Sequence, residues 1–227
     1  TATLTFSPEN WDSEQTVTVT GVDDDFDDGD QDYFVVIGPA VSSDPNYGGM
    51  DPPDVAANNA DDDTAGITIT PTSPPTTTES GGTATFDVVL TSRPTDSVSI
   101  DLGSDDTSEG TASVTNLVFA PENWDVPQTV TVTGIDDAVD DGDIAYNVLT
   151  SGAVSGDSTY NQMSVDDLPL TNEDDDTPSV DVPPVSGVAT SETGGIPAFP
   201  AVRGSQPQAA DTRSLASATV PARTTST

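Results

Sequence analysis

The chain has 227 residues and carries 40 acidic residues against four arginines, with no lysine, so its formal net charge is −36. Such a surface repels nucleic acids and anionic membranes, and we expect neither as a partner. Histidine and cysteine are absent. Their absence excludes disulfides, metal sites built on nitrogen or sulfur, and catalysis by a nucleophile–histidine pair.

Direct membrane insertion is not expected either, because the sequence contains no apolar run of about 18 residues. The chain shows no signal peptide, and Thr1 falls inside a strand-like pattern. We therefore expect it to be a segment of a longer protein.

The sequence repeats itself at a constant offset, which aligns Leu4 with Leu117 and Tyr33 with Tyr146. The stretch "FSPENWDSEQTVTVTGVDDDFDDGD" returns as "FAPENWDVPQTVTVTGIDDAVDDGD". We call this offset the repeat length, and it is typical of a whole domain. We predict the C-terminal half of one repeat at 1–63, a complete repeat at 64–177, and a degenerate or truncated start of a third at 178–227.

Segments of the complete repeat show the alternation or the β-branched content of strands. They are 66–70, 83–91, 97–102, 116–120, 128–134, 144–150 and, more weakly, 163–171. No segment has the apolar period of a helix. About seven strands separated by turn residues predict an all-β fold: immunoglobulin-like antiparallel β-sandwich repeats in tandem.

The C-terminal tail matches the repeat only faintly. Prolines interrupt the pattern after Gly195, and Arg203, Arg213 and Arg223 all lie there. Because half a sandwich cannot bury a core, we expect residues from about 180 onward to be poorly ordered. A truncated or frame-shifted gene end would give the same pattern.

Acidic residues of the complete repeat gather at turns. Glu79 lies between the first and second predicted strands, Asp105 between the third and fourth, and Asp136 between the fifth and sixth. The triplet 174–176 follows the seventh. Consecutive antiparallel strands alternate in direction, so every second connection lies at the same end of a sandwich. These clusters are therefore predicted to meet at one end.

Carboxylates gathered in this way repel one another unless a cation neutralises them. Ca²⁺ accepts six to eight oxygen ligands in irregular geometry, whereas Mg²⁺ requires a stricter octahedron. We therefore predict Ca²⁺ at this end. The alternative is that the acidic turns only keep a secreted surface soluble.

The ordered set "ESGGTATFDVVL", "SDDTSEGTA", "LVFAPENWDVPQTVTVTGIDDAVDDGD" and "NEDDDT" resembles the Calx-beta domain. That family comprises immunoglobulin-like modules of sodium–calcium exchangers and of many bacterial surface proteins. One departure is that Gln31 and Ile144 stand where family members often continue the acidic turn.

The resemblance implies calcium ligands by position. In the complete repeat they are Glu79, Asp105, Asp106, Asp136, Asp137, Asp141, Asp174, Asp175 and Asp176. In the first half-repeat they are Asp23, Asp24, Asp28, Asp61, Asp62 and Asp63, and the N-terminal ligands of that repeat are missing.

The aromatic residues are interpreted as structural. Trp11 and Trp124 recur in "PENWD", where a ring that caps the core is favoured over a sugar-binding platform. Tyr33 and Tyr146 are predicted to be core residues. Paired carboxylates also occur in glycosidases, but that chemistry needs a cleft with one protonated carboxyl. We therefore expect no enzyme.

The leading hypothesis is a calcium-binding structural region of an extracellular or bacterial cell-surface, adhesin-like protein, in which calcium stiffens the junctions between repeats. Its partners would be neighbouring repeats and a cell-surface or matrix receptor. One alternative is a module that binds a carbohydrate or protein receptor. Another is a non-catalytic accessory region of a large secreted enzyme.

Overall fold

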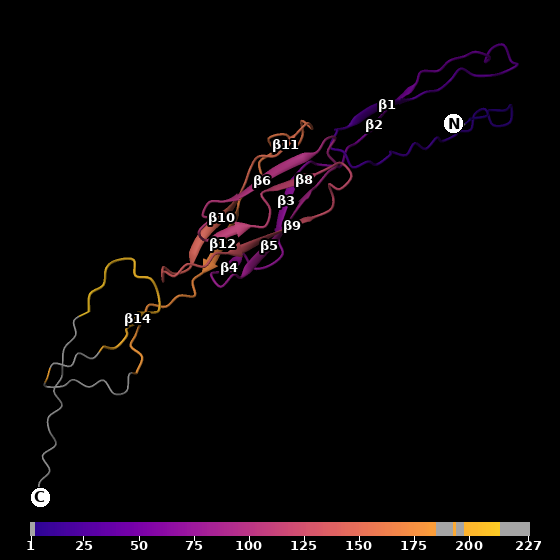
Figure 1. The fold of residues 1–227 in the computed structure, drawn as a ribbon. Helices are drawn as coiled ribbons and strands as arrows, with labels where there is room; N and C mark the ends of the chain where they lie inside the picture. Colours follow the sequence, from indigo (N-terminus) through magenta and orange to yellow (C-terminus); the bar gives the residue numbers. More distant parts are fainter. Residues whose placement is uncertain (1–2, 185–192, 194–197, 214–227) are drawn as a thin grey trace, which may run out of the picture.

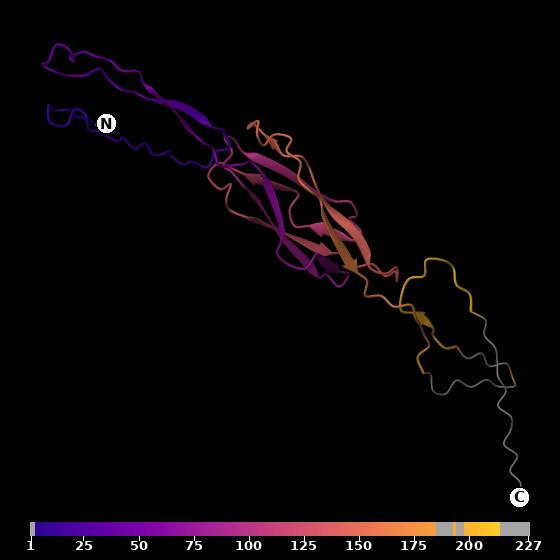
Figure 2. The same ribbon diagram turned by 180° about the vertical axis from the view of Figure 1, so that it is seen from behind.

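The computed structural model describes residues 3–184, 193 and 198–213, and all their regular structure is β. Figures 1 and 2 view the chain from opposite sides and show three parts arranged end to end. They are an N-terminal ribbon, a central sandwich and a C-terminal segment. Among the described residues there is no helix long and apolar enough to cross a membrane.

One sheet of the sandwich has four strands in the order β3-β5-β9-β7, and all its pairs are antiparallel. Its strands are β3 (Ile67–Pro71), β5 (Thr83–Leu90), β9 (Gln128–Gly134) and β7 (Gly110–Ala112).

The second sheet has the order β11-β6-β10-β12-β4, and β8 also pairs with β6. Its strands are β11 (Val154–Ser155), β6 (Val98–Ser104), β10 (Ile144–Thr150), β12 (Leu168–Glu173), β4 (Thr76–Thr78) and β8 (Asn116–Phe119). The pair of β12 and β4 is parallel and the others are antiparallel.

The core lies between the two sheets and follows from the alternation along each strand. Phe86 from β5, Val130 from β9 and Phe119 from β8 are each 0% exposed. Tyr146 from β10 is also buried, and its hydroxyl lies 3.0 Å from the hydroxyl of Thr77. The sequence-based prediction of an all-β sandwich is therefore confirmed.

The predicted strands agree closely with the observed ones. β9 and β10 occupy the predicted ranges, and the weak seventh strand begins later than expected, at Leu168. Three strands, β4, β7 and β11, were not predicted from the sequence, and they have only two or three residues each. A strand that short shows no alternation to read.

The N-terminal ribbon pairs β1 (Gln31–Val35) with β2 (Val55–Asn59). Its register is that of β10 and β12 moved back by one repeat length, because Gln31 pairs with Asn59 as Ile144 pairs with Asn172. Large apolar side chains of the segment before β1 are exposed to solvent, and Trp11 is 70% exposed. The prediction that this ring caps the core is therefore wrong for Trp11 and confirmed for Trp124, which packs against the core of the complete repeat.

The C-terminal segment pairs β13 (Val180–Asp181) with β14 (Val202–Arg203). This register is that of β3 and β5 moved forward by one repeat length, because Val180 pairs with Arg203 as Ile67 pairs with Leu90. Part of the tail predicted to be poorly ordered, residues 185–192, 194–197 and 214–227, lies outside the described residues.

Candidate metal centre

Three acidic loops meet at the end of the sandwich from which β4 and β12 emerge. Because these two strands run parallel, with Thr78 opposite Glu173, the residues that follow them arrive at the same edge. The amide N–H of Glu79 donates to the carbonyl of Glu173 at 3.0 Å. The third loop follows β9 and brings Asp136.

Carboxylate oxygens from these loops form two groups, and in each group the oxygens lie within 4.8 Å of one another. The first group is Glu79, Asp136 and Asp175, and the second is Glu79, Asp174 and Asp176. We call these five residues the acidic pole. The predicted meeting of Glu79, Asp136 and the terminal triplet at one end is therefore what the structure shows.

Glu79 belongs to both groups and is the most enclosed of the five. It is only 4% exposed, and its Oε2 accepts a hydrogen bond from the amide of Asp175 at 3.4 Å. Burial raises the pKa of Glu79 to about 7, and the charges of Asp174 and Asp137 add to the effect. A carboxylate in this position is stabilised either by a proton or by a cation.

Two carboxylates of the terminal triplet, those of Asp174 and Asp176, differ in their hydrogen bonds. Asp174 accepts N–H groups from Asp176 at 2.8 Å and from Gly142 at 2.7 Å, and these bonds lower its pKa. The Oδ2 atom of Asp176 is buried and accepts no hydrogen bond from the described residues. Burial, followed by the charges of neighbouring aspartates, raises the pKa of Asp176.

These donors fit a calcium ion. The set offers only oxygen, it includes a buried acceptor without a partner among the described residues, and it has no histidine or cysteine. Oxygen-only donor sets of this kind are the ones that calcium accepts. In such a site the five side chains of the acidic pole would hold the ion.

Four predicted ligands of the complete repeat lie outside both groups among the described residues: Asp105, Asp106, Asp137 and Asp141. Both oxygens of Asp105 accept hydrogen bonds from Asn147, at 2.6 and 2.7 Å. Asp106 accepts N–H of Ser108 at 3.0 Å. Asp137 lies near enough to raise the pKa of Glu79.

Glu109 also lies next to this end of the sandwich, and it was not among the ligands predicted from the sequence. Glu109 is 7% exposed, and its Oε2 accepts a hydrogen bond from Asn172 at 3.3 Å. Burial is the main cause that raises its pKa, and the charges of Asp106, Asp141 and Asp137 add to it. The only signal in the sequence was an acid directly before a glycine, Gly110.

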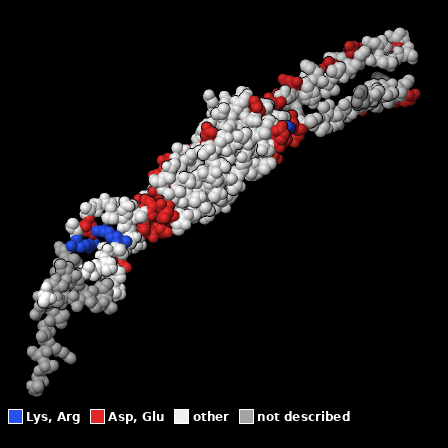
Figure 3. Space-filling model, in the orientation of Figure 1, with Lys and Arg blue, Asp and Glu red and all other residues white. Residues whose placement is uncertain are grey.

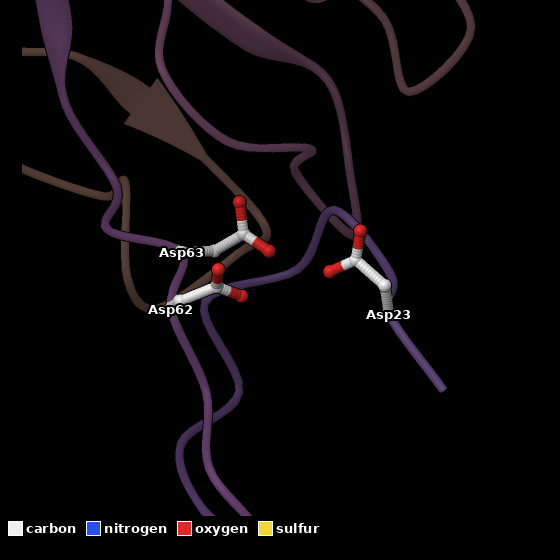
Figure 4. A group of neighbouring side chains, drawn as sticks. All are labelled: Asp23, Asp62 and Asp63. Atoms are coloured by element: carbon white, nitrogen blue, oxygen red, sulfur yellow. The ribbon is translucent and has the colours of Figure 1, made fainter. Parts of the chain in front are cut away.

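The first half-repeat has a smaller group, formed by Asp23, Asp62 and Asp63 (Figure 4). We call it the upstream cluster. Burial, with the charges of nearby aspartates, raises the pKa of Asp63. The other three predicted ligands of this half, Asp24, Asp28 and Asp61, lie outside the group among the described residues.

The hydrogen bonds around Asp61 repeat those around Asp174. The amide of Gly29 donates to Asp61 at 2.7 Å, as the amide of Gly142 donates to Asp174. The two glycines have φ of 76° and 78°, a conformation that favours glycine. The acidic turn therefore forms in both copies. Of the carboxylates among the described residues, the upstream cluster contains only Asp23, Asp62 and Asp63, and none of them stands at the position of Glu79 in the repeat.

Several solved structures resemble this chain, and two of them illustrate the degree of likeness. The chain matches the apo form of the Calx CBD1 domain with 20% identity and a TM-score of 0.37, covering 48% of this chain and 98% of that domain. It matches domains 4 and 5 of the S-layer protein SbsC with 19% identity and a TM-score of 0.27, covering 54% and 58%. Neither likeness is close enough to carry a conclusion about the ligand of this chain. No family model and no curated protein matches.

Proposed function

We propose that the sandwich is a calcium-binding structural module of an extracellular or cell-surface, adhesin-like protein. Calcium at the acidic pole would stiffen the connection to the next repeat. The observation that carries the proposal is Glu79, a buried carboxylate that belongs to two groups of carboxylate oxygens and accepts an amide hydrogen bond of 3.4 Å from Asp175. A divalent cation would offset the cost of keeping it ionised.

The position of the acidic pole supports a role at a junction. Only Thr177, Pro178 and Ser179 separate Asp176 from β13. A cation that binds Asp174, Asp175 and Asp176 would fix the start of this connection. Without a cation, repulsion among the carboxylates would favour a looser arrangement.

The chemistry of the site supports a location outside the cell. Extracellular calcium modules bind with dissociation constants of about 10⁻⁴ to 10⁻³ M, which suits a site open to solvent. Four of the five pole residues are exposed or half-buried. A formal charge of −36 keeps the chain soluble and attracts cations.

Thermal unfolding of the full chain in calcium, magnesium or chelator tests the proposal. At a free calcium concentration 100 times the dissociation constant, one site adds about 2.7 kcal/mol to the free energy of unfolding. We expect a higher midpoint in calcium than in magnesium or chelator. Equal midpoints in all three would contradict the proposal and leave an acidic spacer.

The matched variants are Glu79→Gln and Glu122→Gln. Each replaces a carboxyl group by an amide, but Glu79 is buried at the pole and Glu122 is exposed in another loop. We expect Glu79→Gln to lose most of the calcium-dependent rise in the midpoint and Glu122→Gln to keep it.

A further inference from the structure

A second acidic region lies at the opposite end of the sandwich, where the N-terminal ribbon joins it (Figures 1 and 3). Residues 25–28, which we call the junction loop, contact Arg93 and line a common pocket with residues 91–95 and 157–160, which we call the base of the sandwich. The base contains Arg93, the only lysine or arginine before Arg203. This one cation therefore lies against the acidic end of the preceding repeat.

Three contacts join the junction loop to the sandwich. The amide of Arg93 donates to the carbonyl of Asp25 at 2.7 Å. The carboxylate of Asp27 accepts the amide N–H of Ala65 at 2.8 Å. The guanidinium of Arg93 lies 5.1 Å from the centre of the Phe26 ring, within the range of a cation–π interaction.

The two parts also line a common open pocket of about 480 Å³. The loop contributes Phe26, Asp27 and Asp28, and the base contributes Arg93 and Tyr160 among others. The base is held rigid from within, since the buried Tyr160 hydroxyl donates to the carbonyl of Ser92 at 2.7 Å. The loop therefore docks on a preformed surface.

The backbone part of this contact recurs one repeat length further along the chain. The amide of Gln206 donates to the carbonyl of Ala138 at 2.5 Å, as Arg93 donates to Asp25. The amide of Gly204 donates to Ser179, as that of Thr91 donates to Gly66. Each junction therefore uses the same main-chain geometry.

The side chains differ between the two junctions. Val139 takes the place of Phe26 and Gln206 that of Arg93, so the second junction cannot form the cation–π contact. Pro178 takes the place of Ala65 and has no N–H to donate to Asp140. The first junction therefore has side-chain contacts that the second lacks.

From this geometry we infer that Phe26, Asp27 and Arg93 form a lock that holds the N-terminal ribbon and the sandwich in one orientation without a metal ion. The partner surface of the base is thus the junction loop of the preceding repeat: a phenylalanine ring flanked by carboxylates. The lock acts at the end opposite the acidic pole and does not depend on calcium there.

Distance measurements between spin labels in chelator test the lock. The chain has no cysteine, so Val36→Cys and Val154→Cys supply the only labelling sites. Val36 is 76% exposed in the ribbon, and Val154 is 64% exposed on the sandwich. We expect one narrow distance distribution in the otherwise unchanged chain. The pair Phe26→Val with Arg93→Gln, which gives these two positions the residues of the second junction, should broaden the distribution at least twofold.

The matched control is Val139→Ala, which alters the same position of the second junction and should leave the distribution narrow. The unfolding midpoint of the sandwich should stay the same in all variants, because none of the changes touches the core between the sheets. An unchanged chain as broad as the double variant in chelator would overturn the inference. So would a double variant that stays narrow.

Discussion

Two copies of "QTVTVTG" lie in different surroundings. Val130 and Val132 of β9 are 0% exposed, whereas Val17 and Val19 in the first copy are 47% and 48% exposed. The acidic turns, unlike these strands, are alike in the two copies. In both, a glycine amide donates a 2.7 Å hydrogen bond to an aspartate. The turn thus needs only the strand pair that it adjoins, β1 with β2 or β10 with β12, whereas burial of the strand needs a second sheet.

The same contrast separates the two carboxylate groups. The upstream cluster is built from two nearby turns, whereas the acidic pole adds Glu79 from a distant loop, and that residue is buried. A carboxylate enclosed by the sandwich makes the pole the stronger candidate for a metal ion.

The largest difference in unfolding free energy between the two copies is expected when the same phenylalanine ring is removed from each. Phe119 is 0% exposed and its counterpart Phe6 is 55% exposed. Phe119→Ala should lower the free energy of unfolding by about 3–5 kcal/mol, and Phe6→Ala should change it by less than about 0.5 kcal/mol. Urea unfolding measures both.

If Phe119→Ala abolishes folding, Val132→Ala and Val19→Ala form a milder matched pair. Equal losses for the two members of either pair would contradict the view that only the complete repeat buries a core.

Calcium titration compares the two carboxylate groups directly. Glu79→Gln should weaken calcium binding at the acidic pole by at least about tenfold, the scale seen even for supporting residues around metals. Asp63→Asn should leave that binding unchanged, since Asp63 belongs to the upstream cluster. Calorimetry on the full chain reports both, and a larger loss for Asp63→Asn would reverse the assignment.

The pH dependence of stability in chelator should show the buried acid. The pKa of Glu79 is raised from 4.5 to about 7 in the folded chain, so the folded state keeps a proton that the unfolded state releases between these values. Its contribution to stability is complete below about pH 4.5 and is lost as the pH rises through 7.

Urea unfolding at pH 5 and pH 7.5 measures this dependence. We expect greater stability at pH 5 and a flatter dependence in Glu79→Gln. Glu109, whose pKa is also raised, contributes in the same direction. Stability that rises between these pH values would show that Glu79 is ionised in the folded chain without a cation.

The smallest effect is expected at Asp105. Both its oxygens accept hydrogen bonds from Asn147, which also lower its pKa. Asp105→Asn should therefore leave the calcium-induced rise in the midpoint unchanged. A loss as large as that of Glu79→Gln would place Asp105 among the ligands.

Strand alternation was enough to predict β9 and β10 residue by residue, because valine or tyrosine alternates with polar residues there. Counting strand directions was enough to predict that Glu79 and Asp136 lie at the same end of the sandwich. It could not show that Asp105 lies outside the carboxylate groups, because the direction of a strand does not reveal that Asn147 donates hydrogen bonds to both oxygens of Asp105. It also could not find Glu109, whose burial depends on contact with Asn172 from a strand 63 residues away.

The pairing of β13 and β14 was not expected from the sequence, because prolines obscure the alternation around them. Its register nevertheless repeats that of β3 and β5 after one repeat length. Main-chain pairing needs only compatible backbone angles and free N–H groups, so it survives changes that remove the apolar pattern.

The parallel pair of β4 and β12 has a mechanical consequence. The chain enters the sandwich at the base and leaves it at the acidic pole, and Thr76, Thr77 and Thr78 lie opposite Thr171, Asn172 and Glu173. A force that pulls the two ends of the sandwich apart would slide these two strands past each other. Their hydrogen bonds would then be loaded together, in shear, and would not break one at a time. Glu79 follows β4 and Asp175 follows β12, so an ion bound by both carboxylates would link the two strands and resist this sliding.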